Sequence, residues 1–418
     1  MHNVSNSGSS ASALTNSGTT LELKPSTNER PSMVSDQREC KKVLRDVIPK
    51  SIEESYNKSK NMFDICDPSQ CQFLQLHKHP EVNKIVRLTY TNAGNAILAL
   101  GSNGTHLVWF WPRTNLNLDG KANAKVYPQL WQPKSGFKSM INDLTSIKCG
   151  NPVSCFALSK QDAYLISTSG GKISLFNIFT FKTLTTAMPP PPMVTSLAFY
   201  PEDNNIFAIG LDNSTILIYY VLKDEVLFNL EGHSKRVTAL AFSKTWNILI
   251  SGDVNAQIIV WKTEGWGKLK DRYLQIHGQK VPEVQSETQI QFHPDQTNFL
   301  AVHDSHLAIY EATELRCVKQ WVPEVPVVIS QATFSSNGHS VYAIFVDGTL
   351  AIFEASNLQV LCRVHPCAYL SPTSRLSMWP ISIAAHPLKP TQFAVGLTDG
   401  SIYVFEPREL GGNWIKTQ

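Results

Sequence analysis

The stretch EGHSKRVTALAFSKTWNILISGDVNAQIIVW (Glu231–Trp261) contains three apolar segments separated by polar turns. Arg236–Phe242 alternates toward one face, Asn247–Gly252 is rich in apolar residues, and Gln257–Trp261 ends on an aromatic residue. Alternation, β-branched residues and bounding Gly, Asn and Asp are typical of short antiparallel strands. The stretch therefore predicts three neighbouring strands of one sheet.

The third of these segments has six counterparts along the chain. Each is a short apolar ladder that ends on an aromatic residue: HLVW at Trp109, KISLF at Phe176, TILIY at Tyr219, HLAIY at Tyr310, TLAIF at Phe353 and SIYVF at Phe405. With Trp261 included, successive aromatic residues are 67, 43, 42, 49, 43 and 52 positions apart. A repeat of about 42 residues built from short strands is typical of a β-propeller blade.

The remaining strands complete the count of blades. The three-strand unit recurs at 84–111, 153–177, 194–220, 287–310, 329–353 and 380–405, and short apolar segments between most units supply outer fourth strands. The last unit has only a doubtful outer strand after it, whereas CQFLQL (Cys71–Leu76) precedes the first unit without a blade of its own. A strand borrowed from the N-terminal side removes the open edge of a ring. We therefore expect an all-β fold, a closed seven-bladed propeller over residues 71–410.

The segments outside the repeats have other compositions. Residues 1–35 are rich in Ser, Asn, Thr and Gly and predict a disordered tail, because they cannot bury enough apolar surface to offset the entropy of ordering. Residues 36–70 are charged and predict a linker, and 411–418 form a C-terminal tail. The 67-residue gap predicts an insertion loop at about 112–150, in which PQLWQP supplies the outer strand of the first blade.

Charge and composition exclude several classes of function. The formal net charge is +3 in 418 residues, which gives no electrostatic argument for direct binding of nucleic acid. The chain contains neither the roughly 20 apolar residues of a membrane span nor a signal peptide. Its eight cysteines are too sparse for a disulfide scaffold and predict reduced thiols.

One blade carries a side-chain motif. In WD-repeat blades a histidine after glycine, a strand Ser or Thr, a turn Asp and a strand-ending Trp form a buried hydrogen-bond network. The matching positions are His233, Ser251, Asn255 and Trp261. Asn at the acidic position keeps an acceptor but loses the charge, so the sequence predicts a weakened network whose role is structural.

Other polar groupings give no reactive site. Cys362, His365 and Cys367 offer three ligands where structural zinc needs four, so no metal is expected. His303 and His306 fall at a turn and are expected to be solvated. The tract MPPPPM (188–193) is interpreted as a stiff connector between blades rather than a ligand for another module. No phosphate-binding loop or nucleophile elbow occurs, and we expect no catalytic residue and no cofactor.

Longer segments resemble one family. PSQCQFLQL, NAGNAILALGSNGTHLVWFW, GKANAKVYPQLWQPKSG, EDNNIFAIGLDNSTILIYYV and AHPLKPTQFAVGLTDGSIYVFEP are similar to the second propeller of the plant Topless and Topless-related corepressors, and the resemblance runs from about residue 40 onward. It implies a nuclear scaffold that links DNA-bound repressors or their adaptors to chromatin-modifying complexes and so represses transcription through protein–protein contacts.

The resemblance is partial, and this leaves alternatives open. Family members begin with a helical LisH and CTLH module and a first propeller, whereas residues 1–70 lack helical periodicity, so tetramerisation of the family type is not expected. The chain could be a truncated corepressor that competes for propeller partners. It could also be a general propeller adaptor, such as a substrate receptor for ubiquitin ligation or an assembly scaffold.

A candidate partner-binding face follows from the blade pattern. Ring proteins usually bind partners at the connections into the first strand of each blade and at the turns before the third strand. Lys235 and Arg236 enter the fourth blade beside His233, and Lys172 lies in the corresponding turn of the second blade. These three cations are the candidate contacts, with ordinary solvated charges as the alternative.

Overall fold

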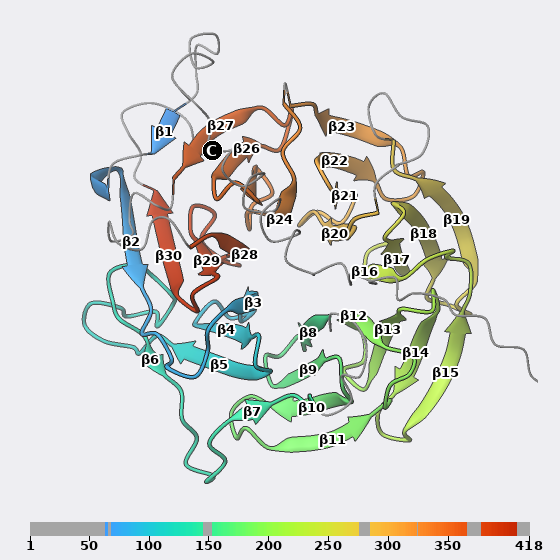
Figure 1. Ribbon diagram of the computed structural model, residues 1–418, viewed down its shortest axis with the longest axis horizontal. Helices are drawn as coiled ribbons and strands as arrows, with labels where there is room; N and C mark the ends of the chain where they lie inside the picture. The colour runs from blue at the N-terminus through green and yellow to red at the C-terminus, as the bar shows by residue number, and fades with distance from the viewer. Residues whose placement is uncertain are drawn as a thin grey trace, which may run out of the picture. The chain divides into compact units, whose positions relative to one another are not determined.

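Seven β-sheets arranged around a central axis make up the described part of the chain (Figure 1). The computed structural model describes residues 63–65, 68–144, 153–275, 285–323, 325–365 and 378–407. All of these residues belong to the second of two compact units, Asn61–Gln418. The expected tails at 1–35 and 411–418 lie outside the described residues. The expected all-β, seven-bladed propeller is confirmed.

Each blade runs from an inner strand outward, and we number the blades in chain order (Figure 1). Blade 1 consists of β3 (Ile85–Tyr90), β4 (Ala96–Gly101), β5 (Thr105–Phe110) and β6 (Gln129–Leu130). Blade 2 consists of β8 (Ser154–Leu158), β9 (Tyr164–Ser169), β10 (Ile173–Asn177) and β11 (Thr183–Ala187). Blade 3 consists of β12 (Val194–Phe199), β13 (Ile206–Leu211), β14 (Ile216–Tyr220) and β15 (Glu225–Leu230).

Blades 4 to 7 repeat the same antiparallel order. Blade 4 consists of β16 (Val237–Ser243), β17 (Ile248–Asp253), β18 (Gln257–Lys262) and β19 (Lys268–Tyr273), and blade 5 of β20 (Gln289–Phe292), β21 (Asn298–His303), β22 (His306–Glu311) and β23 (Cys317–Trp321). Blade 6 consists of β24 (Ile329–Phe334), β25 (Ser340–Phe345), β26 (Leu350–Glu354) and β27 (Val360–Val364). Blade 7 consists of β28 (Pro380–Ala385), β29 (Phe393–Leu397), β30 (Ile402–Pro407) and β2 (Cys71–Gln75).

The strand β2 closes the ring. It pairs antiparallel with β30 in a register that runs from Cys71 opposite Pro407 to Gln75 opposite Tyr403. Its apolar residues face both neighbours, since Cys71 packs in the core between blades 6 and 7 whereas Leu74 packs in the core between blades 7 and 1. The strand that directly precedes blade 1 is thus the outer strand of blade 7, and blade 7 presents no unpaired β30 edge.

The blades are held together by apolar cores between them. Seven clusters of buried residues occur in the described part of the chain, and each combines residues of two adjacent blades. The aromatic residues that end the seven ladders are at most 3% exposed. The repeat seen in the sequence therefore reflects one large aromatic side chain that every blade contributes to a core.

The insertion between blades 1 and 2 adds two short strands to blade 1. The β6 strand lies in PQLWQP and pairs with the end of β5, as the sequence predicted, with Trp109 opposite Leu130. A second strand, β7 (Met140–Ile141), pairs with the start of β5 and was not foreseen. Met140 is completely buried, whereas Leu116 and Leu118 in the same insertion are 85% and 80% exposed.

Part of the expected linker is structured. Within residues 36–70, Phe63–Ile65 form β1, which pairs parallel with the outer strand β27 of blade 6, and Pro68–Gln70 form the 3-10 turn η1. Blade 6 therefore has five strands in the order β1-β27-β26-β25-β24. The linker interpretation is wrong for these residues, because three residues are too few to show a strand period. Nothing in the described ranges is a helix long and apolar enough to cross a lipid bilayer.

Candidate functional site

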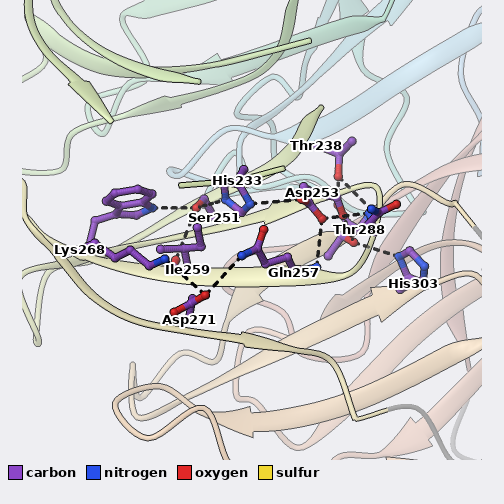
Figure 2. Close-up of polar contacts among 12 residues, drawn as sticks. His233, Thr238, Ser251, Asp253, Gln257, Ile259, Lys268, Asp271, Thr288 and His303 are labelled. Carbon is purple, nitrogen blue, oxygen red and sulfur yellow. Dashed lines mark hydrogen bonds and ion pairs between the residues drawn. The ribbon is translucent and has the colours of Figure 1, made fainter. Parts of the chain in front are cut away.

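The network of blade 4 is centred on the hydroxyl of Ser251 in β17. The indole Nε1 of Trp261 donates a hydrogen bond of 2.8 Å to Ser251 Oγ, and His233 Nε2 shares one of 2.6 Å with the same oxygen. Figure 2 shows Ser251 next to His233, with Asp253 on the other side of the histidine. His233 precedes the inner strand and Trp261 ends the third strand, so these contacts tie three parts of the blade together.

Asp253, not Asn255, supplies the acidic group of this network. His233 Nδ1 lies 3.5 Å from Asp253 Oδ2, which is too long for a good hydrogen bond, and neither atom has a hydrogen-bond partner among the described residues. Oδ1 of Asp253 accepts the backbone N–H groups of Asn255 and Gln257 at 2.9 and 3.0 Å. Asn255 contributes only a backbone donor to this turn. The acidic position is therefore occupied by Asp253 and not by Asn255, and the weakening of the network stays a prediction.

The network continues into blade 5. Thr288 Oγ1 donates to the backbone carbonyl of Asp253 at 2.6 Å and lies 3.0 Å from His303 Nδ1 (Figure 2). Because its one proton goes to the carbonyl, the hydroxyl accepts from His303, which must carry the proton on Nδ1. Backbone and hydroxyl groups of Thr238 and Thr288 form two more hydrogen bonds of 3.0 Å between the blades. These contacts of Thr288 were not predicted, since the partners lie 15 to 50 residues away in the sequence.

Ser251, His233 and Asp253 are the same residue types, in the same order of contact, as a hydrolase triad. Their burial argues against that role. Ser251 and Asp253 are 0% exposed, and the Trp261 indole already occupies one side of the serine oxygen. A substrate carbonyl cannot reach an oxygen that has no exposed surface. The arrangement therefore stabilises the blade.

Blade 2 carries a second buried network, which depends on the insertion. Asn142, just after β7, donates to Ser167 Oγ at 2.8 Å and to Ser169 Oγ at 3.0 Å. His106 of blade 1 shares a hydrogen bond of 2.8 Å with Ser167 Oγ, and its Nδ1 lies 3.1 Å from the Met140 carbonyl. Burial lowers the pKa of His106 to about 4. The insertion therefore fixes the contact between blades 1 and 2.

The two turn histidines of blade 5 are not solvated. His303 and His306 are 1% and 3% exposed. His306 lies 3.2 Å from the Tyr310 hydroxyl and 3.1 Å from the Gln320 amide nitrogen, and burial lowers its pKa to about 4. The expectation of solvated histidines is wrong because both residues belong to strands, β21 and β22, rather than to an open turn.

The possible zinc ligands do not form a cluster in the part of the chain described. Cys362 is buried in β27 opposite Phe63, and Cys367 lies outside the described residues. Among described residues, no group of three or more His, Cys, Asp or Glu side chains could hold a metal ion. The MPPPPM tract connects β11 to β12, from the outer strand of blade 2 to the inner strand of blade 3.

The three predicted face residues lie at the same end of their blades, where the inner strands begin. Lys172 is exposed in the turn between β9 and β10, and Lys235 is exposed ahead of β16. Arg236 is different, since its Nη2 lies 4.0 Å from Glu287 Oε1 and its buried Nε has no hydrogen-bond partner among the residues that the structure describes. Two of the three cations are therefore free to meet a partner, whereas Arg236 is already engaged.

Glu287 also links blade 5 to blade 1. Its Oε2 lies 3.8 Å from Arg87 Nη2, so one carboxylate faces two guanidinium groups. Arg87 and Glu287 line a cavity of about 380 Å³ that receives residues from the inner strands of all seven blades. The lining includes Thr195, Gln289 and Gln331, so the central channel is polar. Exposed ion pairs of this kind add little to stability.

The ring and the blade 4 network together define a WD-repeat β-propeller protein. The WD domain, G-beta repeat family matches residues 224–262, which run from the outer strand of blade 3 through β18 of blade 4. This match is short because blade 4 alone carries the Gly-His dipeptide and Trp261 together.

The resemblance to the Topless and Topless-related proteins is confirmed along nearly the whole chain. Topless-related protein 1 of Arabidopsis thaliana is 49% identical over 419 residues, covering 99% of this chain and 37% of that protein. Protein TPR3 of Oryza sativa subsp. japonica is 50% identical over 393 residues, covering 93% and 34%. Protein TOPLESS of Arabidopsis thaliana is 51% identical over 373 residues, covering 88% and 33%. The chain thus spans about a third of the length of the curated relatives it matches.

Proposed function

We propose that the chain is a non-enzymatic WD-repeat scaffold that contributes to transcriptional repression in the nucleus through protein–protein contacts. The observation that carries the proposal is the 49% identity to Topless-related protein 1 over 99% of the chain. The seven interblade cores support it, because they give a rigid ring whose turns are available for docking. Its partners are transcription factors, repressor adaptors or chromatin-modifying complexes.

A tethering experiment tests the proposal. The full chain is fused to a heterologous DNA-binding domain and its effect on a reporter gene is measured in plant cells. We expect reduced reporter transcription and co-purification of chromatin proteins from nuclear extract. A chain that enters the nucleus but neither lowers transcription nor recovers chromatin or transcription factors would contradict the proposal. Recovery of ubiquitin-ligase subunits instead would favour the adaptor alternative.

The face that docks these partners is proposed to carry Lys172, Lys235 and Arg236. Charge reversal of all three to Glu should remove partners that bind this end of the ring. The matched control reverses Lys160, Lys223 and Lys244, which are exposed in turns at the opposite ends of the blades. If the variant of Lys172, Lys235 and Arg236 keeps every partner, the face assignment is wrong, and a control variant that loses them would place the docking face at the opposite end of the ring. Thermal melts of both variants establish that the ring is intact.

A further inference from the structure

The outer edge of blade 6 is occupied by the chain's own segment. Strand β1 lies parallel to β27, with Phe63 opposite Cys362, Asp64 opposite Arg363 and Ile65 opposite Val364 (Figure 1). The blade is already complete without it, since β24 to β27 form the same four-stranded order as the other blades. The fifth strand therefore covers the outer edge of blade 6 and is not needed to complete the ring.

The composition of β27 allows its edge to accept a strand, as would that of the outer strands β11 and β23, which carry at most one charged residue each. The outer strand β19 of blade 4 reads KLKDRY and carries four charged residues, which discourage pairing with another strand. In contrast, β27 reads VLCRV and has Arg363 as its one charged residue. An apolar edge of this kind offers free backbone donors and acceptors to any extended segment of suitable pattern.

The segment β1 is a weak occupant of this edge. It has three residues and pairs in parallel, the slightly less stable arrangement per residue. Asp64 Oδ1 is buried without a hydrogen-bond partner in the described structure, and a buried unsatisfied oxygen costs stability. A better-matched strand could therefore replace it.

We propose that the β27 edge is a docking site for an extended peptide of a partner protein, and that β1 is an internal placeholder that this peptide displaces. The site would take a short segment of apolar–acidic–apolar pattern, because the chain's own occupant, Phe63–Asp64–Ile65, has that pattern and places its acid opposite Arg363. Backbone hydrogen bonds supply affinity, and the charge at the central position supplies selectivity. This inference goes beyond the proposed role in repression and does not depend on it.

The probe is a labelled peptide with the sequence of residues 61–67 and Ser in place of Cys66. Its binding to the full chain is measured by fluorescence anisotropy. The variant Asp64→Pro removes a backbone donor from the centre of β1 and should bind the peptide at least tenfold more tightly than the unmodified chain does. Asn61→Pro, ahead of β1, is the matched control and should behave like the unmodified chain. Equal binding by all three chains would overturn the proposal.

The charge at the site gives a second test. In the Asp64→Pro background, Arg363→Glu should weaken binding of the acidic peptide about tenfold, and a peptide with Lys at its central position should bind this variant better. Lys319→Glu in β23, the outer strand of blade 5, is the matched control and should change nothing. If the proline variant does not fold, Asp64→Lys keeps the backbone donor and opposes Arg363 instead. If peptide binding does not change with Arg363→Glu, the result contradicts a ligand of apolar–acidic–apolar pattern.

Hydrogen exchange locates the bound peptide. Amides of β27 should exchange faster in Asp64→Pro than in the unmodified chain and regain protection when the peptide is added. Protection confined to another blade would place the peptide elsewhere and refute the site. Concentration-dependent dimers of the unmodified chain, seen by light scattering and abolished by Asp64→Pro, would show that a second copy rather than a partner peptide occupies the edge, which also refutes the proposal.

Discussion

His233 Nδ1 and Asp253 Oδ2 lie 3.5 Å apart, with 1% and 0% of their side chains exposed. A polar group so buried is stabilised when protein groups replace its hydrogen bonds to water. Here Oδ1 of Asp253 accepts two backbone N–H groups, whereas Oδ2 faces the imidazole of His233. The strand end at Asp253 and the connection at His233 are therefore energetically linked, although 20 positions separate them in the sequence.

Asp253→Ala should destabilise the ring much more than Asn255→Ala. Removing the side chain leaves the buried N–H groups of Asn255 and Gln257 without their acceptor and opens space beside His233, so we expect a loss of about 2–4 kcal/mol in the free energy of unfolding. Asn255→Ala keeps its backbone donor and should cost less than about 1 kcal/mol. Urea denaturation of both variants measures the difference. Equal losses of stability in the two variants would mean that Asn255 contributes as much to the network as Asp253 does.

The sequence alone predicts the propeller ring, but it does not predict which residues form the buried network of blade 4. The repeat of buried aromatic residues follows from the chemistry of each blade alone, and the alternation of Cys71–Leu76 marks β2 as a strand without a blade. The acidic position could not be fixed, because Asp253 and Asn255 flank one turn and only the register of β17 decides which side chain points inward. Thr288 joins the network through contacts with the neighbouring blade and brings His303 of its own blade with it, for which the sequence holds no local signal. The three residues of β1 are too few to show any period.

In the closing strand β2, Leu74 should contribute more to stability than its neighbour Phe73. Leu74 is 4% exposed in the core between blades 7 and 1, so Leu74→Ala should cost about 2–4 kcal/mol because it leaves a cavity. Phe73, its neighbour, points the other way, is 37% exposed and has its ring 6.4 Å from that of Tyr403. Phe73→Ala removes more atoms but should cost less, about 1 kcal/mol. A larger loss for Phe73 would mean that β2 sits in the opposite register.

Stability should fall between neutral and mildly acidic pH because of His106. Burial lowers the pKa of this histidine from 6.5 to about 4, so the unfolded chain takes up a proton as the pH falls through 6.5 while the folded chain does so only near 4. The stability contributed by His106 is complete above pH 6.5 and is lost between pH 6.5 and 4, by up to roughly 3 kcal/mol.

His106→Gln tests this linkage, since glutamine does not titrate. The variant is expected to lose stability at pH 7 but to show a shallower decline between pH 6.5 and 4, as measured by urea unfolding at several pH values. His339 is exposed in a turn, and His339→Gln serves as the matched control whose slope should equal that of the unmodified chain. Identical slopes in all three chains would show that His106 is not the group responsible.

The indoles of Trp261 and Trp109 offer a direct measure of the blade 4 network. Both end the third strand of a blade and both are at most 2% exposed. Trp261 Nε1 donates to Ser251 Oγ at 2.8 Å, whereas Trp109 Nε1 is buried without a hydrogen-bond partner in the described structure. Substitution by Phe removes the same atoms at both sites, so the difference between the two losses isolates the hydrogen bond. We expect Trp261→Phe to cost about 1–2 kcal/mol more than Trp109→Phe.

A double-mutant cycle assigns that difference to the serine. Ser251→Ala removes the acceptor, so the losses from Trp261→Phe and Ser251→Ala should not add, with a coupling energy of roughly 1 kcal/mol in urea denaturation. Ser251→Ala combined with Trp109→Phe should be additive, because the two side chains belong to different blades. Additive losses for Ser251 and Trp261 would mean that the indole contributes only through packing and that His233 and Asp253 stabilise the blade without it.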